Sequence, residues 1–597
     1  MAADRIIRRD FLNRTLLGAG AALLKMPAPA FAADTFTGFA GVGDYARSNG
    51  DPWAAVEVGH RMRDGDYKAR MAHAIDTGEE FDLIVLGAGL SGLGAAYYYR
   101  KAGGSRRCLI LENHAMFGGH CKQNEFTVKG RRLLGPQASN DFGVPHEGSG
   151  SQMDELFKEL RIPRTFEWAA PAAGLEGMRI ARDNYSHMDG IADTQVDVAY
   201  NFGGKWAHNI FANALEGAPF SDAVKRDLVK WRTTIGGTEQ VQRHLDSISY
   251  KQYLEGELGL DPAVTKFSEP VIGLICGASP DAVCARAGHT LVRPLNSAGG
   301  ISFPGGNTTF ARHLVKALIA DSMPGELSFR DVLNNSVNFK ALDGQDAPVR
   351  IRLGATVVRL AHAGNGVEAV YEAGGKLYRT RAKKAVAASA GWSNRYVLAD
   401  LPAELHAAYD EFAYAPALSV NVALTNWRFL YKLRAPAVRY FDGEFGWSCN
   451  IRQSMTAGAF APPLDPDEPI VLTFYTGIYE PGRPAKEQGE AGRKKLLTTS
   501  YAEYERLIRR QMTTLFGPAG FDASRDIAGI VLNRWGHARV IQPPGFYYGR
   551  DGRPSPRQIV ERGYGQIAIA HSELNGHQNA TGALAQGKRA AEQIAAG

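Results

Sequence analysis

Cysteine is scarce in this sequence, with five residues scattered over 597 positions. So few and so widely spaced cysteines exclude a disulfide framework or a zinc ribbon. The sequence also lacks a Cys-x-x-Cys-His motif, so a covalently attached c-type haem is not expected. Cys276 and Cys284 are the nearest pair, and we expect buried thiols there, with a bridge in an oxidising compartment as the alternative.

The chain also carries little net charge and has no long apolar run. Its formal net charge is +6, and residues 1–32, with five basic and two acidic side chains, account for half of it. A charge this small argues against a nucleic-acid partner and against strong electrostatic binding to a membrane surface. No apolar run is long enough to cross a bilayer, and we find no repeat or low-complexity tract, so stable membrane insertion is not expected.

The first 32 residues have the order of parts of a twin-arginine export signal. Arg8 and Arg9 are followed by an apolar stretch of ten residues, 15–24, and then by a small-x-small triplet that ends at Ala32. As a helix this stretch spans about 15 Å, half of the roughly 30 Å hydrocarbon thickness, so it is too short for an anchor. We therefore predict export of the folded protein to the periplasm, with cleavage near Ala32.

A glycine-rich stretch after the apolar run 81–86 predicts a nucleotide-binding turn. Gly87, Gly89 and Gly92 have the spacing G-x-G-x-x-G between a strand and a helix start. The first glycine permits the tight turn, the second lets the backbone approach a pyrophosphate, and the third lets the helix pack on the strand. The phosphates would lie at the helix N-terminus beside Ser91, where free N–H groups and the positive end of the dipole point at them.

A second apolar strand, 108–111, ends on Glu112, which lies 25 positions after Gly87. An acidic residue at this strand end accepts hydrogen bonds from an adenosine ribose, although the usual spacing is about twenty residues. Together with the adjacent Asn113, this residue completes a predicted dinucleotide site. The alternative is a glycine turn followed by an ordinary surface glutamate.

The segment "NHAMFGGHCK" indicates which dinucleotide is bound. Its paired glycines, Gly118 and Gly119, come just after the acidic strand and resemble the second FAD contact of glutathione-reductase-type flavoproteins. His120 stands where an arginine often follows the pair in those proteins. The sequence therefore favours FAD over a nicotinamide dinucleotide.

The C-terminus carries a second FAD signal. Residues 566–597 read as a strand, a polar turn and a helix from about Thr581, and they resemble the terminal FAD motif of flavin amine oxidases. The resemblance implies that the helix N-terminus faces the isoalloxazine, where its dipole stabilises the reduced flavin. It also implies that the FAD contacts include Val357, near adenine, and Gly576, Thr581, Gly582 and Ala583.

The same resemblance predicts an α/β fold in two parts. A glutathione-reductase-type, amine-oxidase-like, doubly wound FAD-binding domain would be assembled from the separated segments 79–173, 298–400 and 555–597. A mixed α+β substrate domain would comprise 174–297, which is rich in helical periodicity, and 401–554, which is rich in strand-like segments. A chain of 597 residues with 45% hydrophobic side chains can bury two such cores.

As a whole, the mature chain resembles the bacterial periplasmic spermidine dehydrogenases, within the flavin amine oxidase superfamily. The resemblance rests on "EVGHRMRDG", "FGGHCKQNEF", "ISFPGGNTTFARHLVKALI", "NRWGHARVIQPPGFYYG" and "AIAHSELNGH". It implies FAD-dependent oxidation of a polyamine, and a b-type haem bound by the N-terminal extension 33–78 with His60 as an axial ligand. The stretch "GFAGVGDYARSNGDPW" departs from the family pattern, because it lacks a histidine found there.

Oxidation of an amine defines what the substrate site must do. A neutral amine delivers a hydride from Cα to flavin N5, and water hydrolyses the resulting imine to an aldehyde. The protein must orient the C–H bond, keep the amine deprotonated and exclude bulk water. On the family's active-site stretch, Trp535, Tyr547 and Tyr548 are candidates for an aromatic cage, and His537 is a candidate acid or base.

A dehydrogenase must also pass its electrons on, and we expect a quinone or a cytochrome as the acceptor, by way of haem, in preference to oxygen. Two other functions remain compatible with the sequence. One is a flavin-dependent oxidase or desaturase of a lipid-like or aromatic substrate. The other is a non-catalytic, exported flavin-binding protein that transfers electrons or acts as a scaffold.

Overall fold

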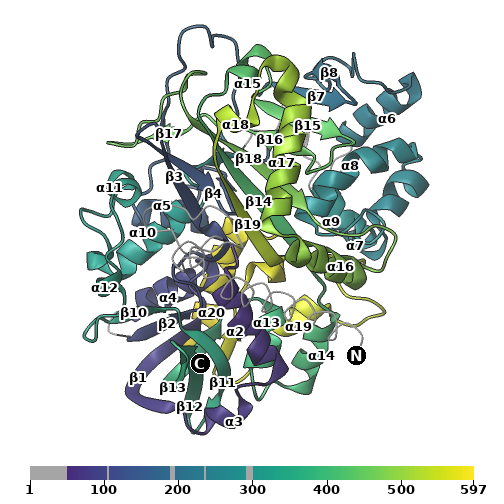
Figure 1. The fold of residues 1–597 in the computed structure, drawn as a ribbon. Helices are drawn as coiled ribbons and strands as arrows, with labels where there is room; N and C mark the ends of the chain where they lie inside the picture. The colour runs from purple at the N-terminus through teal and green to yellow at the C-terminus, as the bar shows by residue number, and fades with distance from the viewer. Residues whose placement is uncertain (1–49, 104–105, 189–194, 234–236, 291–299, 597) are drawn as a thin grey trace, which may run out of the picture.

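The computed structural model describes residues 50–103, 106–188, 195–233, 237–290 and 300–596 (Figure 1). The predicted export signal, residues 1–32, and the first part of the N-terminal extension, residues 33–49, lie outside the described residues. Two seven-stranded sheets organise the described part of the chain, with the first sheet in the lower half of Figure 1 and the second in the upper half.

The first sheet has the strand order β10-β2-β1-β13-β12-β11, with β20 paired to β13. Its strands are β1 (Ile75–Leu86), β2 (Cys108–Glu112), β10 (Val349–Leu353), β11 (Thr356–Ala363), β12 (Gly366–Ala373), β13 (Lys376–Ala387) and β20 (Ile567–Ile569). Strands β10, β2, β1, β13 and β20 run parallel, whereas β12 is antiparallel to β11 and β13. Three segments far apart in the sequence therefore build one sheet.

The central strands of this sheet are apolar on both faces. In β1, Leu83 and Val85 belong to one hydrophobic cluster, and Ile84 and Leu86 belong to another. Every residue of β2 is buried. Parallel strands buried on both faces read as continuous apolar runs, which is why these two strands could be predicted from the sequence.

Helices α4 (Leu90–Ala102), α10 (Thr308–Leu318) and α20 (Ala580–Ala596) pack together on one face of the first sheet. Small residues let α4 and α20 approach closely: a Cβ atom at Gly587 would lie 2.4 Å from the Ser91 carbonyl oxygen. At Gly94 an added Cβ would instead meet Leu584 at an ordinary 3.5 Å. The last helix of the chain is thereby held against the first helix after the glycine-rich turn.

The second sheet has the order β19-β14-β18-β16-β15-β7-β8 and is antiparallel except between β15 and β7. Its strands are β7 (Val198–Phe202), β8 (Lys205–His208), β14 (Tyr414–Leu424), β15 (Ala437–Phe441), β16 (Ser448–Asn450), β18 (Ile470–Gly477) and β19 (Ile527–Val540). The main helices of this half are α6 (Asp222–Thr233), α7 (Glu239–Ser247), α8 (Pro262–Ile275), α9 (Ala285–Thr290), α16 (Ala485–Thr498) and α17 (Tyr501–Phe516).

Two small antiparallel pairs join the halves. The hairpin of β3 (Gln123–Val128) and β4 (Arg131–Pro136) comes from the first half of the chain but packs on the second sheet, where Asn421 Nδ2 donates to the Pro136 carbonyl at 2.8 Å. Strand β6 (Glu167–Trp168) pairs with β17 (Met455–Thr456). Through these two pairs, segments from the first half of the chain contact the second sheet and its loops.

The described part of the N-terminal extension is helical and then joins the first sheet. Helix α2 (Trp53–Asp64) packs on β11 and α13 (Gly391–Val397), and α3 (Lys68–Met71) follows it. The first strand was predicted from residue 81, but β1 starts six residues earlier, and its Ile75 pairs with Tyr378 of β13. The end of the extension is thus part of the sheet.

The remaining elements of the described segments are short. They are α5 (Gln152–Glu159), α11 (Phe329–Asn334), α12 (Phe339–Leu342), α14 (Ala403–Glu411), α15 (Arg428–Lys432), α18 (Ala523–Asp526), α19 (Pro556–Glu561), β5 (Asp141–Phe142), β9 (Ile301–Ser302), four 3-10 turns (Gly119–Cys121, Ala320–Ser322, Gly517–Ala519, Ser572–Asn575) and a π-helical turn (Gln252–Glu257). Among the described helices, none combines the length and apolarity that a membrane span needs. All five cysteines are buried free thiols, as expected for Cys276 and Cys284.

Candidate functional site

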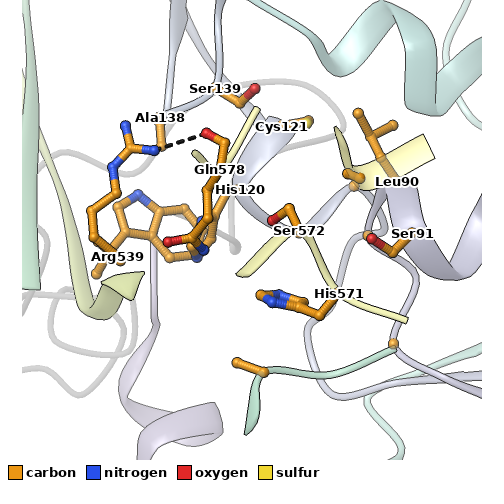
Figure 2. Close-up of a pocket in the computed structure, with 18 of the residues that line it drawn as sticks. Leu90, Ser91, His120, Cys121, Ala138, Ser139, Arg539, His571, Ser572 and Gln578 are labelled. Atoms are coloured by element: carbon orange, nitrogen blue, oxygen red, sulfur yellow. Dashed lines mark hydrogen bonds between the residues drawn. The ribbon is translucent and has the colours of Figure 1, made fainter. Parts of the chain in front are cut away.

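A cavity of about 350 Å³ lies between the two sheets and reaches from the glycine-rich turn to β14 and β19 (Figure 2). Most of the predicted cofactor contacts line it. They are Gly87, Gly89, Ser91, Glu112, Asn113, Gly118, Gly119, His120, Val357 and Ala583. The structure therefore brings predicted contacts from three separated segments of the chain to one cavity.

The glycine-rich turn has the geometry that its spacing predicted. Gly87 has φ +95°, a left-handed value that side chains disfavour. A Cβ atom at Gly92 would lie 1.9 Å from the Gly87 carbonyl oxygen, so only glycine lets the turn close. Gly92 itself does not line the cavity; it shapes the turn that does. Gly89 caps α4, and the helix N-terminus opens onto the cavity at Ser91.

Glu112 lies at the end of β2, where it ties the turn to the following loop. Its Oε2 accepts from the Ala88 N–H at 2.7 Å, and its Oε1 accepts from the His114 N–H at 2.9 Å. Burial alone would raise the pKa of Glu112, but the hydrogen bonds and charge of His114 outweigh it and lower the pKa. Glu112 is thus a buried, ionised acceptor with lone pairs left for a ribose.

The second glycine pair supports the first turn. Gly118 (φ +110°) donates its N–H to the Ala88 carbonyl at 2.8 Å, and a Cβ at Gly119 (φ +54°) would approach Gly89 Cα to 3.2 Å. His120 then packs against Trp535, with ring centroids 4.2 Å apart. Burial lowers the pKa of His120 to about 3, so this ring is neutral and does not supply the charge of the arginine that it replaces.

Sequence analysis missed Lys122, which lies fully buried beside this wall. Its Nζ lies 3.3 Å from the Gly50 carbonyl oxygen and 5.2 Å from the centre of the Trp535 ring. Burial lowers the pKa of Lys122 to about 8, although the charges of Glu112 and Asp51 oppose the shift. Lys122 belongs to no sequence motif, so its position beside the cavity could not be predicted from the sequence.

Asp51 was also missed, because the extension was interpreted through His60. The Asp51 side chain lines the cavity, its Oδ2 accepts from the Gly536 N–H at 3.1 Å, and its Oδ1 lies 3.6 Å from His114 Nε2. Burial would raise the pKa of Asp51, but His114, His120 and the Gly536 hydrogen bond outweigh it and lower the pKa. A carboxylate from the N-terminal extension therefore faces the cavity.

The C-terminal segment brings the start of α20 to the cavity. Asn579 caps this helix, because its Oδ1 accepts from the Gly582 N–H at 2.7 Å. Asn579, Ala580 and Ala583 line the cavity, together with His571, Ser572 and Gln578, which Figure 2 labels. The predicted contacts Gly576, Thr581 and Gly582 lie outside the lining, where Gly576 (φ +76°) shapes the preceding turn. An α20 N-terminus at the cavity favours negative charge there.

The far end of the cavity is apolar and aromatic. Tyr185 and Tyr475 lie with ring centroids 5.1 Å apart, and both hydroxyls donate to the Ala138 carbonyl, at 3.2 Å and 2.9 Å. Trp535 fixes its ring by donating Nε1–H to the Gln137 carbonyl at 2.9 Å. Arg539 Nη1 donates to the Gln578 carbonyl at 3.0 Å, the contact drawn in Figure 2. This end could hold an elongated substrate between oriented rings.

The structure does not bring the four predicted catalytic side chains together. Trp535 lines the cavity, but His537 lies one layer behind it, where it stacks on Trp392 with ring centroids 4.3 Å apart. Burial, with the charge of Arg493, lowers the pKa of His537 far below its usual value. An irregular register between β14 and β19, where Ala417 faces Trp535 but Ala415 faces Arg539, breaks the strand alternation that would put both rings on one face.

Tyr547 and Tyr548 lie outside the cavity lining, in contrast to the predicted cage. They follow the end of β19 and are turned toward α7, because their N–H groups donate to the Asp246 carboxylate at 3.1 Å and 2.9 Å. The Arg286 guanidinium lies over both rings, 4.1 Å and 4.7 Å from their centres. Their cation–π partner is therefore a residue of the protein.

His60, the predicted axial ligand of haem b, lies half-buried on α2. Neither the large cavity nor a small one beside Leu133 and Leu464 is lined by His60. His537 is packed between Trp392 and Tyr414. In the described segments, no group of three or more His, Cys, Asp and Glu side chains could hold a metal ion. Haem b stays a prediction without support from this geometry.

Comparison with protein families identifies one segment. Residues 85–160 match the family described as NAD(P)-binding Rossmann-like domain, and this segment contains the glycine-rich turn, Glu112 and the second glycine pair. No curated protein matches the chain in sequence. The match supports a dinucleotide site at the cavity and covers only that part of the chain.

Several solved structures share the fold along most of the chain. Putrescine oxidase bound to putrescine has a TM-score of 0.56 at 16% identity, covering 87% of this chain and 100% of that one. Cyclohexylamine oxidase from Brevibacterium oxydans (0.55, 16%, 87% and 99%) and a putative protoporphyrinogen oxidase from an Exiguobacterium species (0.54, 14%, 87% and 99%) are similar. Identities this low show the fold alone. The structural matches confirm the predicted amine-oxidase-like, FAD-binding Rossmann-type fold with mixed α/β sheets.

Proposed function

We propose that this protein is an exported FAD-dependent oxidoreductase that oxidises the C–N bond of an amine, with polyamines as the first class to test. The observation that carries the proposal is the single cavity that joins a dinucleotide turn, the N-terminus of α20 and an aromatic end. Structural neighbours that include a putrescine oxidase and a cyclohexylamine oxidase support the amine class.

The cavity residues fit FAD. The Gly87–Gly92 turn and the α4 N-terminus suit the pyrophosphate, and Glu112 suits the adenosine ribose. The α20 N-terminus, capped by Asn579, suits the electron-rich edge of the isoalloxazine. Bound there, FAD would supply the two-electron oxidation. The protein itself provides fixed backbone donors and a dipole of the right sign.

The aromatic end would orient the amine. The hydrogen bonds that hold Tyr185, Tyr475 and Trp535 fix three ring faces, which attract a cationic chain. Enclosure between the two sheets disfavours a charged ammonium at the reacting end, so the bound amine is kept in its neutral form. Because His120 is neutral, it adds no repulsive charge to this wall.

The first test is the cofactor. Denaturing the purified protein should release a yellow flavin with the adenylate attached, identified by chromatography and mass spectrometry. The second test is anaerobic bleaching of the bound flavin by putrescine, spermidine, cyclohexylamine, alcohols and lipid-like aromatic compounds. Bleaching by amines alone supports the proposal, and release of a nicotinamide dinucleotide or of no cofactor contradicts it.

A non-amine substrate is the second candidate, and a specific observation favours it. Met188, Val271, Leu274 and Ile275 add apolar side chains to the cavity lining, which also contains the guanidinium of Arg539. Such a surface suits an apolar compound with an anionic group better than a polyamine. Bleaching by non-amines only would favour this candidate. Flavin that no compound bleaches would favour a non-catalytic electron-transfer or scaffold protein.

Export, the electron acceptor and haem belong to the same proposal. The order of parts in residues 1–32 supports periplasmic export. The test fuses these residues to a reporter protein and measures whether the reporter is exported. Export should be lost when Arg8 and Arg9 are both replaced by lysine. We propose a quinone or cytochrome acceptor, tested by comparing turnover with a quinone mimic against oxygen. An absorption spectrum of the purified protein, with His60→Ala as the comparison, decides whether a b-type haem is present.

A further inference from the structure

The N-terminal extension reaches the cavity at Asp51, which the proposed chemistry does not use, and Gly50 precedes it. The Gly50 N–H donates to Gln137 Oε1 at 2.9 Å, and its carbonyl oxygen lies 3.3 Å from Lys122 Nζ. The Asp51 N–H donates to the Arg534 carbonyl at 2.9 Å. Gln137 and Lys122 come from the chain after the dinucleotide turn, whereas Arg534 lies on β19. Gly50 and Asp51 are therefore held both by the segment after the dinucleotide turn and by β19.

Only glycine fits at the first of these positions. Gly50 has φ +63°, and a Cβ atom there would lie 2.7 Å from the Arg534 backbone nitrogen and 2.8 Å from its carbonyl oxygen. Backbone atoms of β19, which is held by its pairing with β14, cannot move aside as a flexible side chain can. The close approach brings the next residue, Asp51, into the cavity lining.

The Asp51 side chain lines the cavity together with Glu112, His120 and Trp535. Its carboxylate faces His114, which in turn contacts Glu112 at 3.0 Å, and about a third of its side chain (30%) stays accessible to the cavity. A carboxylate repels phosphate but is a strong acceptor for hydroxyl groups. Between its phosphates and its ring systems, a flavin dinucleotide offers hydroxyls on a ribose and on a ribityl chain.

We propose that Gly50 and Asp51 form a clasp on the bound dinucleotide, in which the Asp51 carboxylate accepts hydrogen bonds from its ribose or ribityl hydroxyl groups. The inference rests on the proposed flavin site. It assigns residues 50 and 51 of the N-terminal extension to cofactor retention, because the clasp must contact β19 for Asp51 to reach the cavity.

The test measures the dissociation constant for FAD on apo-protein, by quenching of flavin fluorescence, in parallel with the melting temperature of each apo-protein. Asp51→Ala removes the acceptor, and loss of a charge-assisted hydrogen bond should weaken FAD binding at least about tenfold. Gly50→Ala should weaken it to a similar degree, because the added Cβ unseats the clasp. Asp51→Asn, which keeps the shape and one acceptor, should fall between Asp51→Ala and the wild type.

Two matched variants control for effects on the fold. Gly78 has φ +66°, and a Cβ there meets nothing within 4 Å, so Gly78→Ala imposes the same backbone strain without a collision. Asp64 is an acidic residue of the same extension whose contact is the adjacent Arg63. Gly78→Ala and Asp64→Asn should leave the FAD dissociation constant within about twofold of the wild type.

The outcomes separate this inference from the proposed function. Unchanged FAD affinity in Asp51→Ala and Gly50→Ala, in a wild type that binds FAD and oxidises a substrate, overturns the clasp and leaves the function intact. A fall in the apo-protein melting temperature without a change in FAD affinity shows a purely structural role and overturns it as well. A wild type that binds no FAD overturns both.

Discussion

The two sides of the cavity differ in which part of the chain forms the contacts. On the side of the first sheet, the contacts come from backbone atoms and helix ends, at the Gly87–Gly92 turn, the Gly118–Gly119 pair and the α20 N-terminus. On the side of the second sheet, they come from side chains such as Trp535 and Arg539, on strand β19. Backbone recognition needs glycine at fixed positions, whereas a side-chain wall can be built from many residues.

We expect the largest effect of a substitution on FAD binding at Gly92, on the side of the first sheet. Gly92→Ala puts a Cβ atom 1.9 Å from the Gly87 carbonyl oxygen, so the turn cannot close and FAD binding should fall below detection. Gly94→Ala on the same helix is the matched control, because its Cβ would meet Leu584 at 3.5 Å, and it should bind FAD like the wild type. Fluorescence titration of the refolded apo-proteins measures both. Equal affinities would show that the turn tolerates a side chain, and the contrast between the two sides would then fail.

This contrast explains how much could be predicted from the sequence. The turn, β2, Glu112 and the terminal helix were predicted because backbone geometry fixes their residue types and spacings. Val357 and the second glycine pair followed from a family resemblance. The part of the fold around the first sheet could therefore be predicted from the sequence, apart from the early start of β1 at Ile75.

The rest could not be predicted, because it depends on long-range packing. Whether Trp535 or His537 faces the cavity is decided by the irregular register of β19 on β14. The direction of Tyr547 and Tyr548 is decided by Asp246, which lies about 300 positions away in sequence. Asp51 reaches the cavity through contacts of residues 50 and 51 with Gln137, Lys122 and Arg534. None of these contacts leaves a local pattern.

A second prediction concerns the side-chain wall. Trp535→Ala removes a fully buried ring and should destabilise the protein by about 3–5 kcal/mol, measured by chemical denaturation. Trp535→Phe keeps an aromatic face but loses the hydrogen bond to Gln137, and should cost about 1 kcal/mol and raise KM for the substrate. His537→Gln, which changes a residue behind Trp392, should leave KM unchanged. If His537→Gln raised KM as much as Trp535→Phe, the cavity wall would be misassigned.

A third prediction uses pH to probe the boundary between the two sides, where Lys122 lies. In the unfolded chain Lys122 keeps its proton up to pH about 10.5, whereas in the folded chain its pKa is about 8. Between these values the unfolded state binds more protons, so the contribution of Lys122 to stability rises with pH, by at most about 3 kcal/mol. Below pH 8 its contribution is constant.

Lys122→Met should therefore remove a rise in the free energy of unfolding between pH 8 and 10.5, measured on apo-protein by denaturant titration. The difference between variant and wild type isolates Lys122 from other groups that titrate in that window. The variant should also be more stable than the wild type at pH 7, because the cost of burying an ammonium is gone. A stability difference that does not change with pH would contradict the shifted pKa.

The smallest effect on catalysis is expected from substitutions of Tyr547 and Tyr548. These variants test which side chains of the second-sheet half contact the substrate. Tyr547→Phe and Tyr548→Phe keep the rings that stack under Arg286, and neither residue lines the cavity, so kcat and KM for the best substrate should stay within about twofold of the wild type. Tyr475→Phe is the informative partner, because it removes the hydroxyl that donates to Ala138 in the cavity wall and should raise KM. Steady-state kinetics of the three variants decide between the two placements. A large loss of kcat in Tyr547→Phe or Tyr548→Phe, with Tyr475→Phe unaffected, would mean that aromatic residues after β19 reach the substrate in the working enzyme, as the sequence alone suggested.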